Sequence, residues 1–498
     1  MPGHATAEYT DLHGLDAPEA TRATLLWFFA LGVAFDLTFN GQQTGIAIPL
    51  LALALCASLR SVARRSRETD VLLIGAIVVS IFPALRASQQ LASIDLIAAS
   101  ALLGLVATQD LGPISRITAK ALANRGLAVP RRALKAAHYI AAPLRRHGGG
   151  RLRVALRVAG IALPIVALFA GLLASGDRVF ARFLSSILPR WDFGSILAHI
   201  AITLIGATLA AVLWRVAVGR EDSAPEPVSG PRDHILSFPE WATVLGGINV
   251  LFSAFVIVQF EYLFGGHRRV DVTPGLTYAE YARSGFFQLA TAAALTVLLI
   301  LAAWDAGQRD HPSHERTFRA LVTAMVALTA VVLISAVKRL ALYEGTFGFT
   351  IKRFFSYVGI ASIGAMLIVL LGAIWWSRRE RLVFSFLAVG FAALLAINIL
   401  NPDRFVAIHN VSRFDATGRI DVEYLGTLDA DAVPAAVGVL DRLNLNDRRA
   451  LRLALCEQLR GLGPEPSWRS INLGRASARS ALEAARITSQ TCEAAPFR

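Results

Sequence analysis

Long uninterrupted runs of apolar residues constrain this chain more than any other feature. A helix that crosses roughly 30 Å of hydrocarbon needs about 20 mostly apolar residues, at about 1.5 Å per residue. Eleven stretches approach or reach that length: 23–39, 43–59, 71–87, 91–107, 154–175, 193–217, 240–263, 282–304, 318–343, 354–376 and 382–400. Because the runs are continuous and do not alternate with polar residues, they predict helices and not the strands of a membrane barrel.

The composition agrees with a membrane-embedded chain. Of the 498 residues, 55% are hydrophobic and 17% are charged, whereas soluble domains average roughly 45–50% and about 25%. These values argue against a soluble enzyme and against disorder over most of the chain. We therefore predict an all-α, polytopic transmembrane bundle with a small helical tail. The first four runs are short and closely paired, so one pair could instead form a re-entrant hairpin.

Composition also divides the chain into four regions. Residues 1–107 hold the four short runs, and residues 108–153 form a basic loop. Residues 154–400 hold the seven longer runs, and residues 401–498 are polar enough to form a small soluble tail. We expect a two-part membrane domain joined by the basic loop and followed by the tail.

The tail carries signals for short helices. Asp429 or Asp431 can cap one helix and Asn446 a second, because side-chain oxygens of Asp and Asn accept hydrogen bonds from the first free N–H groups of a helix. The helices expected are about 429–443, 446–460 and 475–486.

Three cysteines occur in the sequence. Cys56 lies in a predicted span and is most simply a small apolar packing residue. Cys456 and Cys492 both lie in the tail, and an extracytoplasmic tail would be in a compartment that permits a disulfide between them. Spacing alone does not decide the pairing, so the bonded and free states both stay open.

Lysine and arginine are distributed unequally between the two sides of the predicted bundle. If the eleven runs simply alternate, the loops on one side carry 22 of these residues and the opposite loops carry nine. Basic residues favour cytoplasmic loops. This predicts a bacterial plasma-membrane protein with a cytoplasmic N-terminus and an extracytoplasmic tail. An even number of spans would reverse the side of the tail.

Residues 108–153 concentrate the positive charge. This loop holds ten basic residues and one acidic residue, in a chain of formal net charge +13. Basic segments beside spans lie on anionic leaflets and gain about 1 kcal/mol for each base near the surface. We expect the bilayer, with anionic lipid at 108–153, as the partner. Nucleic-acid binding is the alternative, and we expect none because bases this close to spans usually contact lipid.

The usual motifs for chemistry are missing from the sequence. It has no phosphate-binding loop and no Cys-x-x-Cys, and His314-Glu315 is not followed by the second histidine of a zinc-protease motif. The histidines show no i, i+4 pairing of the kind that binds metal on a helix. We expect no catalytic residue, no metal site and no cofactor.

Ionisable residues near the ends of predicted spans form a candidate polar cluster: Glu261, Lys338, Arg339, Arg86 and Asp95. Charges at membrane depth are costly and are often functional. One interpretation is an outward-facing polar cavity, in which Glu261 pairs with Lys338 or Arg339 and Arg86 pairs with Asp95. The other interpretation, which we favour, is snorkelling and ion pairing at helix ends.

Specific residue strings join the seventh and eighth predicted spans. The residues that stand out are Tyr262, Gly265, Gly266, Tyr278, Glu280, Tyr281, Arg283 and Gly285. Further strings are Lys338-Arg339-Leu340, Gly348-Phe349-Thr350, Asn401-Pro402-Asp403, Asp421 with Tyr424-Leu425, Asp431-Ala432-Val433-Pro434, and Trp468 with Asn472 and Arg475. Together they resemble the bacterial membrane proteins grouped as domain of unknown function 4173, over roughly residues 155–480. The resemblance implies a membrane location and no particular activity. The glycines and interfacial aromatics also fit a simple turn between two helices.

Our leading functional hypothesis is a non-enzymatic integral membrane protein with a structural, sensory or accessory role in the envelope. The alternative is a secondary transporter or channel that uses the outer polar cluster. Transporters often show inverted repeats with broken spans at matching positions. Pro49, Pro83 and Pro164 lie inside early spans, and no proline lies inside the later ones to match them. This pattern favours the first hypothesis.

Overall fold

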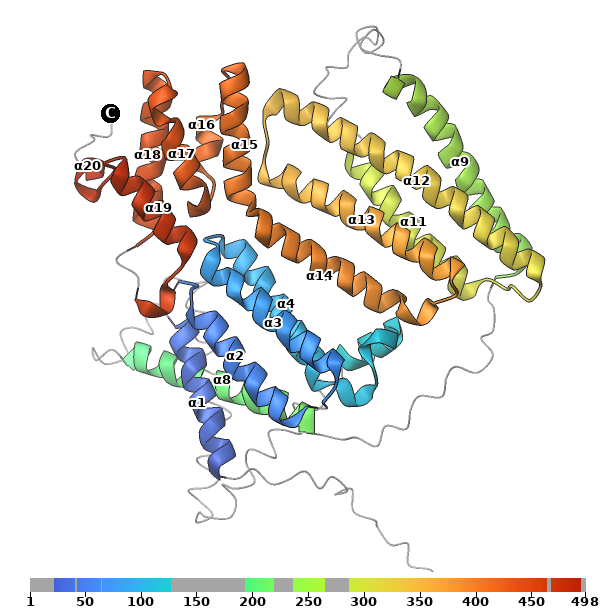
Figure 1. The fold of residues 1–498 in the computed structure, drawn as a ribbon, viewed down its shortest axis with the longest axis horizontal. Coiled ribbons are helices and arrows are strands. Elements are labelled where there is room, and N and C mark those ends of the chain that lie inside the picture. The colour runs from blue at the N-terminus through green and yellow to red at the C-terminus, as the bar shows by residue number, and fades with distance from the viewer. Residues whose placement is uncertain are drawn as a thin grey trace, which may run out of the picture.

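The described part of the chain is almost entirely helical (Figure 1). The structure is a computed structural model, and it describes residues 22–40, 43–63, 65–126, 193–218, 236–264, 286–463 and 467–493. Within these ranges the strand-type pairing consists of one isolated bridge between Leu236 and Gly307. The predicted all-α class is confirmed.

Ten of the eleven predicted runs form apolar helices. Seven helices in the described ranges are long and apolar enough to cross a membrane. They are α3 (Arg67–Leu85), α4 (Gln89–Ala107), α9 (Phe238–Phe264), α11 (Phe286–Ala306), α12 (Pro312–Phe347), α13 (Ile351–Trp375) and α14 (Leu382–Leu400). Shorter apolar stretches lie in α1 (Arg22–Phe39), α2 (Ala47–Val62) and α8 (Phe193–Val218). The predicted run 154–175 lies outside the described residues.

The helices run back and forth, so the bundle has two ends. At the end that we call the tail end, short turns join α1 to α2, α3 to α4 and α12 to α13, and α14 leads into the tail. At the opposite end, which we call the loop end, Arg379 pairs with Asp305, and Arg116 lies 4.0 Å from Glu380. These pairs join the α13–α14 connection to α11 and to the segment after α4.

The first helix group contains α1 to α4 and α8. Helices α1 and α8 are antiparallel and approach very closely, because a Cβ atom at Gly32 would overlap Thr203 and Ala207, and one at Gly206 would overlap Phe35. Small residues allow such close contact between membrane helices. Helix α8 lies in the range 154–400 with the later spans, and it packs against α1, α2 and α4.

The second group contains α9, α11, α12 and α13, and large side chains hold it together. Trp241, Phe318 and Met325 are fully buried between these helices, with Leu367 and Leu370 of α13. Helix α14 lies between the two groups (Figure 1). Its Phe391 ring would contact a Cβ atom at Gly75 of α3.

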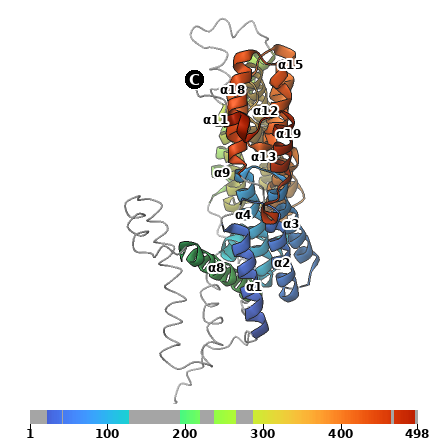
Figure 2. The ribbon, with the colours of Figure 1, turned by 90° about the vertical axis from the view of Figure 1, so that its left-hand side faces the viewer.

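The tail is a small helical unit that stacks on the tail end (Figures 1 and 2). Its helices are α15 (Pro402–Thr417), α16 (Val422–Gly426), α17 (Val433–Val439), α18 (Leu445–Gly461), α19 (Leu473–Ala484) and α20 (Ser489–Glu493). Single 3₁₀ turns are η1 (Gln109–Leu111), η2 (Ile114–Arg116), η4 (Arg379–Arg381), η5 (Ala430–Ala432), η6 (Leu440–Arg442) and η7 (Trp468–Ser470). The tail has its own buried core, which includes Leu425, Val439, Leu451, Leu455 and Leu482.

Helix α15 is an element that the sequence analysis did not predict. Asn401 ends α14 in the left-handed conformation, with φ 53°, and its side chain also caps α15 by accepting a hydrogen bond from the N–H of Arg404. Pro402 then occupies the first helical position, where its missing N–H has no cost. The chain therefore turns sharply from the last membrane helix into the tail.

Two predicted helix starts in the tail are also wrong. Asn444, and not Asn446, caps α18, because its Oδ1 accepts a hydrogen bond of 2.9 Å from the N–H of Asp447. Neither Asp429 nor Asp431 caps a helix with its side chain. The predicted helix 429–443 is instead broken into η5, α17 and η6.

Candidate functional site

The turn between α3 and α4 is held by three buried polar contacts from the tail. Asn472 donates hydrogen bonds from its Nδ2 to the carbonyl oxygens of Pro83 at 2.9 Å and Arg86 at 2.7 Å. Asp431 accepts one of 2.6 Å from the N–H of Ala87. The last carbonyls of a helix have no partner within it, so these contacts satisfy the end of α3.

A second set of contacts ties the tail to the start of α2. The N–H of Ile46 donates a 3.0 Å hydrogen bond to the carbonyl of Ile471. Arg475 donates to the carbonyl oxygens of Thr44 and Ser470. Gly474 of α19 lies so near Asp431 that a Cβ atom there would overlap its carboxylate. The tail is thus joined to the membrane helices by hydrogen bonds to their backbone.

Arg86, which one interpretation of the polar cluster paired with Asp95, closes the end of α14. Its Nε donates a 2.8 Å hydrogen bond to the carbonyl of Asn398, and its Nη2 donates one of 3.3 Å to that of Ile399. Arg86 follows the last residue of α3, within reach of carbonyls that α14 leaves free. Asp95 instead accepts a 2.7 Å hydrogen bond from the Nδ2 of Asn398, and both of these side chains are buried.

The turn between α12 and α13 is fixed by residues from the tail. The side chain of Asn410 accepts a 2.8 Å hydrogen bond from the N–H of Phe349 and donates one of 2.9 Å to its carbonyl. The N–H of Ile351 donates a 2.8 Å hydrogen bond to the hydroxyl oxygen of Tyr424. The guanidinium of Arg353 donates to the carbonyl of Gly348 and lies 4.3 Å from the centre of the Tyr343 ring. The guanidinium of Arg353 therefore makes its contacts within the turn.

These contacts surround a cavity of about 1050 Å³ at the junction of the tail, the α3–α4 turn and the α12–α13 turn, which we call the tail-side cavity. Its lining residues are Ser88, Gln90, Leu91, Ile94, Leu340, Tyr343, Thr350, Ile351, Lys352, Arg353, Phe355, Ser356, Pro402, Asp403, Tyr424, Thr427, Leu428 and Asp429. A smaller cavity of about 230 Å³ shares Thr350, Arg353 and Tyr424 with it. The lining includes residues from four of the sequence strings described above, namely Leu340, Thr350, Pro402 with Asp403, and Tyr424.

The tail-side cavity carries charges of both signs. Lys352 and Asp429 are exposed on its wall, whereas Asp403 is only 7% exposed. The carboxylate of Asp403 accepts a 3.0 Å hydrogen bond from the N–H of Asp429. Burial raises the pKa of Asp403 to about 6, and the charges of Asp429 and Asp431 act in the same direction. Asp403 is therefore a group that can change its charge near neutral pH.

The rest of the predicted cluster is placed only in part. Lys338 and Arg339 lie on α12, and Leu340 of the same turn lines the tail-side cavity. The side chains of Glu261 and Tyr262 lie outside the described residues, so the pairing of Glu261 with Lys338 or Arg339 stays a prediction. The remaining strings of that connection also lie outside them: Gly265, Gly266, Tyr278, Glu280, Tyr281, Arg283 and Gly285.

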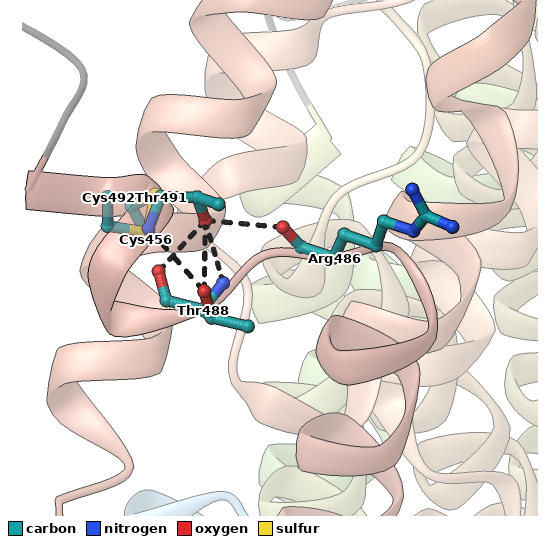
Figure 3. Close-up of a disulfide and its surroundings, with 5 residues drawn as sticks. All are labelled: Cys456, Arg486, Thr488, Thr491 and Cys492. Carbon is teal, nitrogen blue, oxygen red and sulfur yellow. Dashed lines mark hydrogen bonds between the residues drawn. A yellow bond between two sulfur atoms is a disulfide. The ribbon is translucent and has the colours of Figure 1, made fainter.

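Cys456 and Cys492 form a disulfide that ties α20 to α18 (Figure 3). The connection leading into α20 is closed by hydrogen bonds from the Thr491 hydroxyl to the carbonyl oxygens of Arg486 and Thr488 (Figure 3). Cys56, in contrast, is a free thiol that packs in the core of the first helix group.

The residues that build the site were hard to assign from sequence. Asp403, Asn410 and Asn472 are single polar residues whose partners lie 26 to 389 positions away. A usable signal was the Asn401-Pro402 pair, because an asparagine before a proline is a common helix start. No group of three or more metal-ligating side chains comes together among the residues that the structure describes.

The fold and the docked tail define the class of the molecule. It is a polytopic, α-helical membrane protein with a small helical tail packed on one end of the bundle. The chain belongs to the family described as Domain of unknown function (DUF4153), which matches residues 73–438, from α3 to α17. The resemblance to domain of unknown function 4173 is not confirmed. No curated protein and no solved structure matches the chain.

Proposed function

We propose that the chain is a non-enzymatic bacterial plasma-membrane protein that binds a small polar ligand in the tail-side cavity and serves a sensory or accessory role in the envelope. The observation that carries this proposal is the cavity itself. It has a volume of about 1050 Å³ and joins the tail to two membrane turns. Ligand sites commonly fall between roughly 300 and 1,000 Å³ and often lie where structural units meet.

In the proposed orientation the N-terminus is cytoplasmic and the tail is extracytoplasmic. The loop end carries the arginine-rich connections, which favour the cytoplasm. The tail carries the disulfide between Cys456 and Cys492, and disulfides persist mainly in oxidising compartments outside the cytoplasm. Two independent features thus support the same orientation. We also propose that the basic residues of 108–153 contact anionic lipid and not nucleic acid.

The charges on the cavity wall favour a ligand that carries both signs. Lys352 can receive a carboxylate, and Asp429 and Asp403 can receive an ammonium group, because opposite charges attract strongly in partly desolvated sites. We therefore propose a small zwitterion as the ligand class.

Transport is the alternative, and the position of the cavity argues against it. The described residues that line the cavity come from the tail and from the tail-end turns of α4, α12 and α13, and none comes from the loop-end half of a helix. A conducting site would need access from both faces of the membrane.

The proposal is tested by thermal unfolding of the purified protein with free amino acids as zwitterions, and with matched monocarboxylates and monoamines as single-charge probes. We expect only zwitterions to raise the unfolding temperature, and Lys352→Ala and Asp429→Ala to abolish that shift. Asp441→Asn, at an exposed tail carboxylate away from the cavity, should leave it intact. A shift that persists in both cavity variants contradicts the proposal, and uptake of the amino acid into liposomes would support transport.

A further inference from the structure

A further cavity, of about 600 Å³, lies in the first helix group, where α1, α2, α4 and α8 meet α14. We call it the loop-side cavity. Most of its wall is apolar: Leu31, Phe35, Leu51, Leu55, Ala101, Leu103, Leu105, Leu209, Ala210, Val212, Leu213 and Leu387. Leu122, Arg125 and Gly126, from the segment that follows α4, line it as well. It shares no lining residue with the tail-side cavity.

Arg125 is an unusual residue for such a wall. It is 3% exposed, and its Nη2 donates a 2.6 Å hydrogen bond to the carbonyl of Gly112. Its Nε and Nη1 have no hydrogen-bond partner among the residues that the structure describes. A buried guanidinium that leaves donors unpaired is costly. An acceptor of hydrogen bonds, and above all an anion, would remove that cost.

The acidic groups near Arg125 do not supply this acceptor. The carboxylate of Glu68 accepts hydrogen bonds from the N–H of Ile114 at 2.8 Å and from the hydroxyl of Ser115 at 2.5 Å. Asp110 and Glu68 attract the guanidinium of Arg125 electrostatically. The Nε and Nη1 of Arg125 nevertheless make no hydrogen bond to either carboxylate. These acids help to keep the guanidinium charged while leaving its donors available.

We infer that the loop-side cavity binds one anionic phospholipid, with a phosphate oxygen at Arg125 and an acyl chain along the apolar wall. The charge and the wall together select a molecule with an anionic head and an apolar tail. Basic pockets between membrane helices on the cytoplasmic side bind such headgroups. The inference rests on the proposed contact of residues 108–153 with anionic lipid and gives that contact a defined site.

The chain offers a way to fill the cavity without removing the charge. Gly104 lines the cavity, and a Cβ atom placed there meets no atom within 4 Å. Gly104→Leu should therefore occupy the space of the acyl chain while α4 keeps its fold. Gly246→Leu on α9 is the matched control, because Gly246 also has open space and lies in the other helix group. Arg116→Gln, at a largely exposed arginine of the same segment, is the control for charge.

The experiment is native mass spectrometry of the purified full chain in detergent, titrated with phosphatidylglycerol or with phosphatidylcholine. We expect one phosphatidylglycerol to bind in preference to phosphatidylcholine. Arg125→Gln should weaken its binding about tenfold or more, the effect of losing a charge-assisted hydrogen bond. Gly104→Leu should weaken binding of both lipids, and the two controls should bind as the wild type does.

Equal binding of phosphatidylglycerol by the wild type, Arg125→Gln and Gly104→Leu would overturn the inference. So would equal affinity of the wild type for the two lipids. Inorganic phosphate is tested separately by thermal unfolding, and stabilisation equal to that by phosphatidylglycerol would identify an ion site instead of a lipid site. In detergent both ends of the protein are accessible, so the result does not depend on the orientation in the membrane. The two cavities share no lining residue, so it also does not depend on zwitterion binding in the tail-side cavity.

Discussion

The α3–α4 turn at the tail end and the α13–α14 connection at the loop end are held by different kinds of polar contact. At the tail end, Asn472 and Asp431 are 2% and 7% exposed, and their partners are backbone groups left free where α3 gives way to α4. At the loop end, the side chains of Arg116 and Glu380 are 63% and 53% exposed, and their partners are each other.

This difference implies unequal strength. A buried backbone group that loses its partner costs about 1–3 kcal/mol, whereas an exposed ion pair contributes roughly 0–1 kcal/mol. The tail should therefore be fixed rigidly on the membrane helices, which keeps the tail-side cavity open. The α13–α14 connection at the loop end should tolerate change.

Asn472→Leu should have the largest effect on stability. It leaves the carbonyls of Pro83 and Arg86 unpaired and removes the side-chain cap of α19. We expect a loss of about 3 kcal/mol or more, measured by thermal unfolding in detergent. Asn444→Leu, the same change at an exposed cap in the tail, should cost about 1 kcal/mol. Equal losses would show that the tail is not docked as described.

Loss of the disulfide should come next. Cys492→Ser should lower the free energy of unfolding by about 2–4 kcal/mol, the usual value for a native bridge. The wild type should also migrate faster than Cys492→Ser on a non-reducing gel and equally under reduction. Cys56→Ser, at the buried free thiol, should leave the gel mobility unchanged. Identical non-reducing mobility of the wild type and Cys492→Ser would contradict the bond.

Asp403 should make the stability of the folded protein depend on pH. Its pKa in the folded protein is about 6, above the ordinary value of 3.8. Because the folded state holds this proton more tightly than the unfolded state, stability should fall as pH rises from about 4 to about 6 and stay lower above that range. The change is on the order of 2 kcal/mol. Asp403→Asn should remove this part of the pH dependence and raise the unfolding temperature at pH 7.5. An unchanged pH profile in the variant would contradict the assignment.

Arg379→Gln should have the smallest effect. The side chains of Arg379 and its partner Asp305 are 36% and 61% exposed, so the ion pair is partly solvated and should contribute less than about 1 kcal/mol. The long hydrogen bond of 3.3 Å from Arg379 to the carbonyl of Trp304 is part-buried and should add little to this. The measurement is the same unfolding curve at low and high salt. A loss as large as that of Asn472→Leu would remove the contrast between the two ends.

Much of the fold could be predicted because hydropathy is a local signal. A run such as 382–400 must form a helix in a bilayer, since its backbone groups have no other partner there. Where each helix packs is not a local property. Helix α8 follows the basic loop in sequence but packs against α1, and the small residues Gly32 and Gly206 that allow this close contact do not stand out in sequence. Helix α15 was missed although Asn401-Pro402 marked its start.

The candidate site was less predictable than the spans. Asp431 looked like a helix cap, since an aspartate before a helix usually is one. Its carboxylate instead accepts a hydrogen bond from the N–H of Ala87, 344 positions away. A pair between Arg86 and Asp95 belonged to the cavity interpretation, which we did not favour. The guanidinium of Arg86 instead donates hydrogen bonds to the carbonyls of Asn398 and Ile399 at the end of α14. These carbonyls are more than 300 positions away, so the sequence around Arg86 does not predict the contact.

The proposed ligand-binding function requires a tail-side cavity that faces the outside of the cell. The direct measurement is labelling of single introduced cysteines in intact bacteria with a membrane-impermeant maleimide, since the native cysteines are buried or bonded. Lys352→Cys, on the cavity wall, should react in intact cells, and Arg378→Cys, exposed at the loop end, should react only after permeabilisation. The reverse pattern, or no reaction of Lys352→Cys in either state, would contradict the account.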